Sequence, residues 1–250
     1  MQPRTSYIVS VIVAAGIALA GFFVAQGLLG MKQSERIVAV KGLSEREVTS
    51  DLALWNLGYT VTGSDLAATQ KELESQAGVL TAFLTSAGLK ADEISQGALK
   101  ITDRQANQYN NNGENGPRYI LSTQLKLRST NIDAVLKASR SIGDVVRDSG
   151  VVLGAPDQYG CDLRLVFTGL DGIKPEMIAE ATKDARRAAE QFAKDSGVSV
   201  GAIKTATQGY FAISSRDGSD ENSGGGSACE AETSVVKKVR VVTNVTYFLD

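Results

Sequence analysis

Residues 48–62 read VTSDLALWNLGYTVT, and together with the helical pattern of 64–88 they indicate the kind of fold. β-Branched and aromatic residues dominate 48–62, and apolar side chains occupy even and odd positions alike, which predicts one long strand partly covered on both faces. From Leu66 to Ala87 apolar residues recur at helical spacing, between Ser64 as N-cap and Gly88 as stop. A strand followed by an amphipathic helix is therefore the first unit of the chain.

Similar units follow along the chain. Further strands are predicted at 36–41 (ended by Gly42), 94–102, 119–128, 151–153, 159–168, 204–213 and 234–249. A long polar hairpin loop separates 94–102 from 119–128. The second helix begins at Thr130 and ends at Gly150, and the third has Pro175 near its first turn and ends at Gly197. The order ββα, ββα, ββα, ββ predicts an α+β fold with one antiparallel sheet and amphipathic helices on one face.

The third helix has the best-defined apolar face. The residues predicted to share that face are Ile178, Ala181, Ala185, Ala188 and Phe192. The small alanines would let this helix lie close to a sheet. Its basic residues (Lys183, Arg186, Arg187, Lys194) could hold an anion, but nearby carboxylates favour an ion-paired, solvated surface.

The N-terminal segment from Tyr7 to Leu29 is almost wholly apolar. As a helix it would span roughly 34 Å, enough to cross a hydrocarbon core of about 30 Å. It is predicted to be an uncleaved transmembrane anchor (1–30), followed by a linker (31–35) and an exported domain (36–250). A cleaved signal peptide with an A-x-A site at Ala18-Leu19-Ala20 is the alternative. Both interpretations place the domain outside the cytoplasm.

Composition excludes several kinds of chemistry. Histidine is absent, which removes Ser-His-Asp and Cys-His catalysis, and two cysteines are too few for a thiolate zinc site. A net charge of −2 argues against nucleic-acid binding. The oxygen-rich loop Asp217–Asn222 lacks the spacing of a calcium loop. The sequence therefore predicts no enzyme, no cofactor and no metal, and it identifies no ligand.

Cys161 and Cys229 form an even pair in a chain predicted to be exported. In an oxidising compartment the expected state is one disulfide, and two unpaired buried thiols are the alternative. A bond between them would stabilise the fold by about 4 kcal/mol in the chain-entropy model.

Two stretches carry a family resemblance: VKGLSER at 40–46 with DLALW at 51–55, and ATKDARRAAEQFA at 181–193 with Gly197 and Gly201. They resemble the SIMPL-domain family of bacterial envelope proteins, in its Gram-negative branch, over residues 36–250. The resemblance implies an α+β fold, a periplasmic, secreted or membrane-attached location, self-assembly and a link to oxidative-stress tolerance. It supplies no catalytic residues. The Asn-rich insertion at 105–117 is a departure that would alter a surface used in assembly.

The leading functional hypothesis is a non-enzymatic, inner-membrane-anchored protein whose periplasmic domain forms homo-oligomers and supports envelope or stress physiology. Long strands with exposed edges favour assembly. A monomeric periplasmic module that binds a small molecule or peptide is the alternative.

Overall fold

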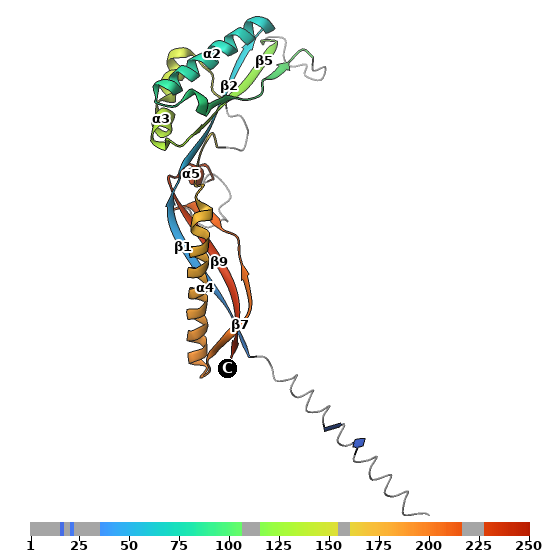
Figure 1. The fold of residues 1–250 in the computed structure, drawn as a ribbon. Coiled ribbons are helices and arrows are strands. Elements are labelled where there is room, and N and C mark those ends of the chain that lie inside the picture. Colours follow the sequence, from blue (N-terminus) through green and yellow to red (C-terminus); the bar gives the residue numbers. More distant parts are fainter. Residues whose placement is uncertain (1–15, 18–20, 23–35, 107–115, 155–160, 217–227) are drawn as a thin grey trace, which may run out of the picture. The chain divides into compact units, whose positions relative to one another are not determined.

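The computed structural model describes residues 16–17, 21–22, 36–106, 116–154, 161–216 and 228–250 (Figure 1). The elements run in the order β1 (Ile37–Thr49), β2 (Leu52–Gly63), α2 (Leu66–Ser86), a 3-10 turn η1 (Ala91–Glu93), β3 (Ile94–Gln96), β4 (Lys100–Asp103), β5 (Tyr119–Ser129), α3 (Ile132–Ser149), β6 (Leu163–Val166), α4 (Leu170–Asp195), β7 (Val200–Gln208), β8 (Ala212–Ser215), α5 (Ala228–Thr233) and β9 (Val236–Leu249). The α+β class is confirmed.

The strands form two antiparallel sheets, so the prediction of one sheet is wrong. The change of sheet occurs within 48–62, which is two strands rather than one. The Ser50 amide donates to the Val235 carbonyl at 2.8 Å, whereas the next amide, that of Asp51, donates to the Val166 carbonyl at 3.0 Å. Successive residues therefore bond to the ends of different strands. Because apolar residues lie on both sides of this point, the sequence pattern did not reveal the break between β1 and β2.

The five-stranded sheet has the order β3-β5-β2-β6, with β4 also paired to β5. β2 and β5 pair without interruption from Ala53↔Ser129 to Gly63↔Tyr119. Leu57 and Tyr59 of β2 are buried in one core with Leu80 and Leu84 of α2 and with Val135 of α3. Figure 1 shows α2 and α3 over β2 and β5. This part of the molecule has the predicted arrangement, an antiparallel sheet with helices on one face.

The four-stranded sheet has the order β1-β9-β7, with β8 also paired to β9. β1 and β9 are antiparallel, because the Leu249 amide bonds to the Arg36 carbonyl at 2.8 Å and the Ser50 amide bonds to the Val235 carbonyl. α4 runs alongside β1 and β9 (Figure 1). Ala185 and Ala189 of α4 are buried with Val40 of β1 and with Val245 and Tyr247 of β9.

The chain divides into two compact units: residues 44–180 with 210–242, and residues 1–43 with 181–209 and 243–250. The larger unit contains the five-stranded sheet, α2, α3, β8 and α5. β1, α4 and β9 each contribute residues to both units.

Three local predictions about α4 and β1 are corrected. β1 continues through Gly42 to Thr49, so Gly42 does not end it. Pro175 lies inside α4, which begins five residues earlier at Leu170. Pro175 has no amide to donate to the carbonyl of Asp171, and its ring crowds that carbonyl, but so near the start of α4 only one helical hydrogen bond is lost and the helix continues. Phe192 is exposed, because the buried face of α4 passes through Ala189 and Ala193 instead.

Cap positions and strand limits also differ from the predictions. Asp65 and Asn131, each one residue beyond the predicted Ser64 and Thr130, accept hydrogen bonds from the amides of Ala68 and Ala134. The stops at Gly88 and Gly150 are confirmed, and both glycines have positive φ.

The predicted strand 94–102 is two strands, β3 and β4, and 204–213 falls partly on β7 and partly on β8. Of the predicted strands 151–153 and 159–168, only a bridge at Leu153 and β6 are seen in the described residues.

The hairpin loop between the second pair of strands is confirmed in its described part, since Asp103 pairs with Tyr119. Residues 107–115 of the loop lie outside the described residues. The predicted anchor Tyr7–Leu29 falls outside them too, apart from four residues, as does the linker 31–35. Within the part of the chain that is described, no helix is both long and apolar enough to cross a membrane.

Candidate functional site

β7 is an edge strand whose side chains are exposed on both faces. All seven residues from Ala202 to Gln208 are exposed. On one side β7 pairs with β9, and among the described residues no strand pairs with its other side. We call residues 202–208 with their outer backbone groups the β7 edge.

The register with β9 explains why both faces of the β7 edge are uncovered. Ala206 pairs with Val245, so the two side chains lie on the same face of the sheet, the face on which α4 packs. Val245 is 1% exposed, whereas Ala206 is exposed, which means that α4 covers this part of β9 but does not extend over the neighbouring part of β7. Thr205 and Thr207 point to the opposite face and are exposed as well.

The two halves of the β7 edge differ in regularity. The pairing with β9 shifts between Val200 and Ile203 and again between Ile203 and Thr205, but Thr205 to Gln208 pair in unbroken register. Such irregularities are a common protection of sheet edges. The Lys204 ammonium lies over the Phe248 ring of β9, 5.5 Å from its centroid. The regular half, 205–208, is therefore the part whose geometry suits pairing with another strand.

Gly42 allows α4 to approach β1 closely. A Cβ atom at Gly42 would lie 1.8 Å from the Ala181 carbonyl oxygen and 2.6 Å from the Ala185 nitrogen. Both are backbone atoms of α4, so any side chain would push the helix away. The neighbouring Leu43 amide donates to Asp184 Oδ2 at 3.1 Å, and this hydrogen bond is the main reason that the pKa of Asp184 is lowered.

Polar contacts join the next part of β1 to α4. Ser44 Oγ donates to Glu180 Oε2 at 2.8 Å, and Arg46 pairs with Glu176 at 2.8 Å and with Glu180 at 2.9 Å. The Ser44 hydroxyl, followed by the Arg46 guanidinium, lowers the pKa of Glu180. These contacts fix the position of α4 against this part of β1.

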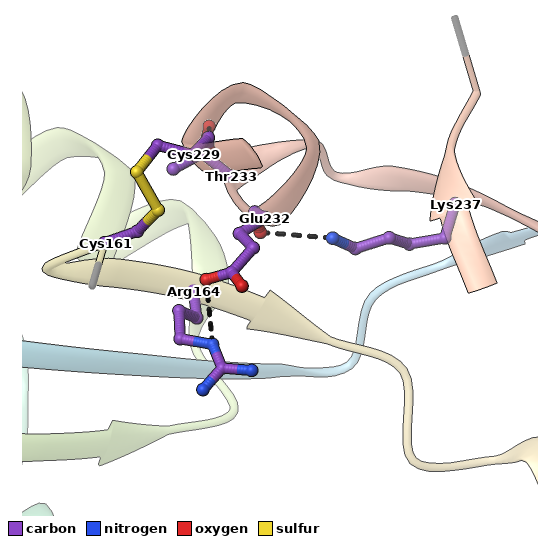
Figure 2. The surroundings of a disulfide bond; sticks show 6 residues. All are labelled: Cys161, Arg164, Cys229, Glu232, Thr233 and Lys237. Carbon is purple, nitrogen blue, oxygen red and sulfur yellow. Dashed lines mark hydrogen bonds and ion pairs between the residues drawn. A yellow bond between two sulfur atoms is a disulfide. The ribbon is translucent and has the colours of Figure 1, made fainter. Parts of the chain in front are cut away.

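Cys161 and Cys229 form a disulfide, as predicted, with their Cα atoms 5.3 Å apart (Figure 2). The bond joins the segment before β6 to α5. Figure 2 also shows Arg164 of β6 directed at Glu232 of α5, with 2.9 Å between Nε and Oε2. The Lys237 ammonium of β9 donates to the Glu232 carbonyl oxygen at 3.1 Å.

The other residues singled out in the sequence do not form a site in the described structure. Arg186 pairs with Glu190, and Arg187 pairs with Asp184, in agreement with the ion-paired, solvated surface favoured for α4. The loop 217–222 lies outside the described residues. In the ranges that the structure describes, no group of three or more acidic, cysteine or histidine side chains is placed to hold a metal ion.

The sequence did not lead us to predict the close approach of α4 at Gly42, the exposed β7 edge or the helix α5. A signal for Gly42 was present, because a glycine inside a β-branched run facing an alanine-rich helix indicates close approach. A signal for the β7 edge was the run Thr205–Gln208, which has small and polar residues and no apolar alternation. α5 has six residues and follows a Gly-Ser run, too short a segment for periodicity to reveal.

The fold and these contacts define a two-sheet α+β protein with one disulfide and an open sheet edge. The SIMPL family, described as "Protein of unknown function (DUF541)", matches residues 38–247. The chain therefore belongs to the SIMPL family, as its sequence predicted. No curated protein matches the chain.

Proposed function

We propose that this chain is a non-enzymatic protein of the bacterial envelope whose copies assemble by pairing at the β7 edge. In the proposed setting, residues 7–29 anchor it in the inner membrane, the domain lies in the periplasm, and the assembly supports envelope or oxidative-stress physiology. The β7 edge is the observation that carries the proposal.

Backbone chemistry supports pairing at this edge. An unpaired strand edge presents amide and carbonyl groups that bond to another strand. The alanine and threonine side chains of 205–208 are small, so a second strand can approach without displacing a large group. Two copies related by a two-fold axis would place β7 antiparallel to β7, because in such an interface the same surface is used twice.

Two observations support the proposed location. The apolar segment 7–29 has the length of a membrane-spanning helix. The Cys161–Cys229 disulfide is typical of proteins in oxidising compartments, such as the periplasm. An anchor would also restrict copies to a plane in one orientation and so raise their effective concentration.

The first test is the native mass of the full-length chain in detergent and of the chain beginning at residue 32. We expect one defined oligomer for both, because the β7 edge belongs to the domain. If only the full-length chain associates, the N-terminal helix is responsible and the β7 edge is not. Two monomers would overturn the assembly and favour a monomeric binding module.

The second test changes the edge itself. Thr205→Lys with Thr207→Lys puts two positive charges on one face of the edge, and pairing would bring four together. Like charges on opposed strands are destabilising, and we expect association to weaken about tenfold or more, since about 1.4 kcal/mol corresponds to tenfold. Thr85→Lys, on the exposed surface of α2, is the matched control and should leave the native mass unchanged. Equal association of the unchanged chain and both variants would contradict pairing at β7.

A further inference from the structure

α5 is a helix of six residues, Ala228–Thr233, that lies against β6 and β8. A helix this short does not persist in water by itself, because one or two turns do not offset the cost of nucleation. Its position must therefore come from its attachments. Two of them are the Cys161–Cys229 bond to the segment just before β6 and the Arg164–Glu232 ion pair to β6 itself (Figure 2).

These two attachments differ in strength. The side chains of Arg164 and Glu232 are 53% and 38% exposed. Water and salt screen an ion pair of this kind, which contributes little to stability. The disulfide is covalent and cannot open by thermal motion. It is therefore the stronger of the two attachments on this side of α5.

The C-terminal turn of α5 covers a buried amine. Lys237 lies on β9 and is 6% exposed, although lysine is among the residues least often buried. Its ammonium donates to the Glu232 carbonyl oxygen of α5 at 3.1 Å. Burial is the main cause that lowers the pKa of Lys237, and the charge of Glu232 opposes that shift while Arg164 adds to it. While α5 is in place, the amine is shielded from reagents in solution.

We propose that the Cys161–Cys229 disulfide is a redox latch that holds α5 over Lys237. Reduction by a dithiol breaks the S–S bond through thiol–disulfide exchange. The two cysteine sulfurs take up two electrons and two protons, and the dithiol is oxidised to a disulfide. α5 then leaves β6, and the Lys237 amine becomes accessible to solvent and to electrophiles.

Access to the latch is provided by Cys229, which is an exposed residue. Exposed disulfides are the ones that thiols attack readily, whereas buried ones resist reduction. The opening is local, because Leu163 and Leu165 of β6 pack on the core of the five-stranded sheet independently of α5. The latch rests on contacts within the larger unit and does not depend on assembly at the β7 edge.

The test is the acylation rate of individual lysines in the full chain, measured by peptide mass spectrometry before and after treatment with dithiothreitol. In the oxidised protein we expect Lys237 to react about tenfold or more slowly than the neighbouring Lys238, which is less buried. Reduction should raise the Lys237 rate about tenfold or more and change the Lys238 rate by less than about twofold. Circular dichroism follows the fold in the same samples.

Two variants test whether the disulfide, rather than the ion pair, keeps α5 in place. Cys161→Ser with Cys229→Ser should show the fast Lys237 rate with or without dithiothreitol. Glu232→Gln removes the ion pair but keeps the disulfide, and Lys237 should stay protected until the bond is reduced. An unchanged Lys237 rate with both thiols shown to be free would refute the latch. Loss of the whole fold on reduction would refute it too, because the bond would then hold the domain rather than α5.

Discussion

Two helices of this protein pack on sheets in different ways. α2 meets the five-stranded sheet through large side chains, with Leu73, Leu80 and Leu84 buried against Leu57 and Tyr59 of β2. α4 meets β1 and β9 through alanines and a glycine. Its buried residues recur every four positions, and they are Met177, Ala181, Ala185, Ala189 and Ala193.

The difference shows what each kind of contact tolerates. A contact between leucines buries much apolar surface, and truncation of one side chain leaves a cavity. A contact between small residues brings backbones together and buries less surface, but it has no room for an added atom. The two helices should therefore fail under opposite kinds of mutation, loss of atoms for α2 and gain of atoms for α4.

The largest effect is expected from Leu80→Ala in α2. Leu80 is 0% exposed, and loss of a fully buried leucine side chain should lower the free energy of unfolding by about 3–4 kcal/mol. Urea unfolding followed by circular dichroism measures it. Leu66→Ala in the same helix, where the side chain is 37% exposed, is the control and should cost less than about 1 kcal/mol. Similar losses for both would mean that α2 does not pack as described.

Gly42→Ala should have the next largest effect, by adding one methyl group. Its Cβ would overlap backbone atoms of α4, and the helix must move, which should cost about 2–3 kcal/mol. Gly143→Ala is the matched control, because it lies inside α3 with nothing within 4 Å of its Cβ position. There the change should raise the free energy of unfolding by about 0.5–1 kcal/mol, because alanine has a higher helix propensity than glycine. Thermal unfolding gives both values, and the same sign for both would contradict close approach at Gly42.

The smallest effect concerns the polar contact between α4 and β1. The Ser44 hydroxyl lowers the pKa of Glu180 below its ordinary value of 4.5. Folding is therefore favoured above that ordinary value, and the contribution is lost as the pH falls through the lowered pKa of the folded state. Ser44→Ala should make the melting temperature less sensitive to pH between about 5 and 3. Ser95→Ala, which loses a hydrogen bond to the backbone oxygen of Lys126 instead, should keep the wild-type profile.

The sequence predicted elements best where periodicity ran over many residues. β5, β9, α2 and α3 lie within a few residues of their predicted bounds because turn-forming residues and glycines with positive φ mark their ends. The division into two sheets could not be predicted in the same way. It depends on the partners of Ser50 and Asp51, which are more than a hundred residues away along the chain.

For the candidate sites, the sequence predicted which residues form a covalent bond better than it predicted which residues are exposed or buried. An even pair of cysteines in a chain expected to be exported was enough to predict the Cys161–Cys229 bond, because composition and compartment decide it. The only sequence signal for the exposure of the β7 edge was the small and polar run Thr205–Gln208, because that exposure depends on how far α4 extends over the sheet. The hydrogen bond of the buried Lys237 to α5 could not be predicted either, because α5 is a six-residue helix with no sequence pattern of its own.

The hydrogen bond between Leu249 and Arg36 has a mechanical consequence. It joins the residue just before β1 to the last residue of β9, and β1 and β9 run antiparallel from that point. A pulling force applied between residues 36 and 250 would thus load the inter-strand hydrogen bonds one at a time. The two strands would separate progressively from this end. A force that slides α4 along β1 would instead load many contacts at once, among them the close approach at Gly42 and the bonds from Leu43, Ser44 and Arg46 to α4. A domain pulled at residues 36 and 250 should therefore yield first at β1 and β9, at low force.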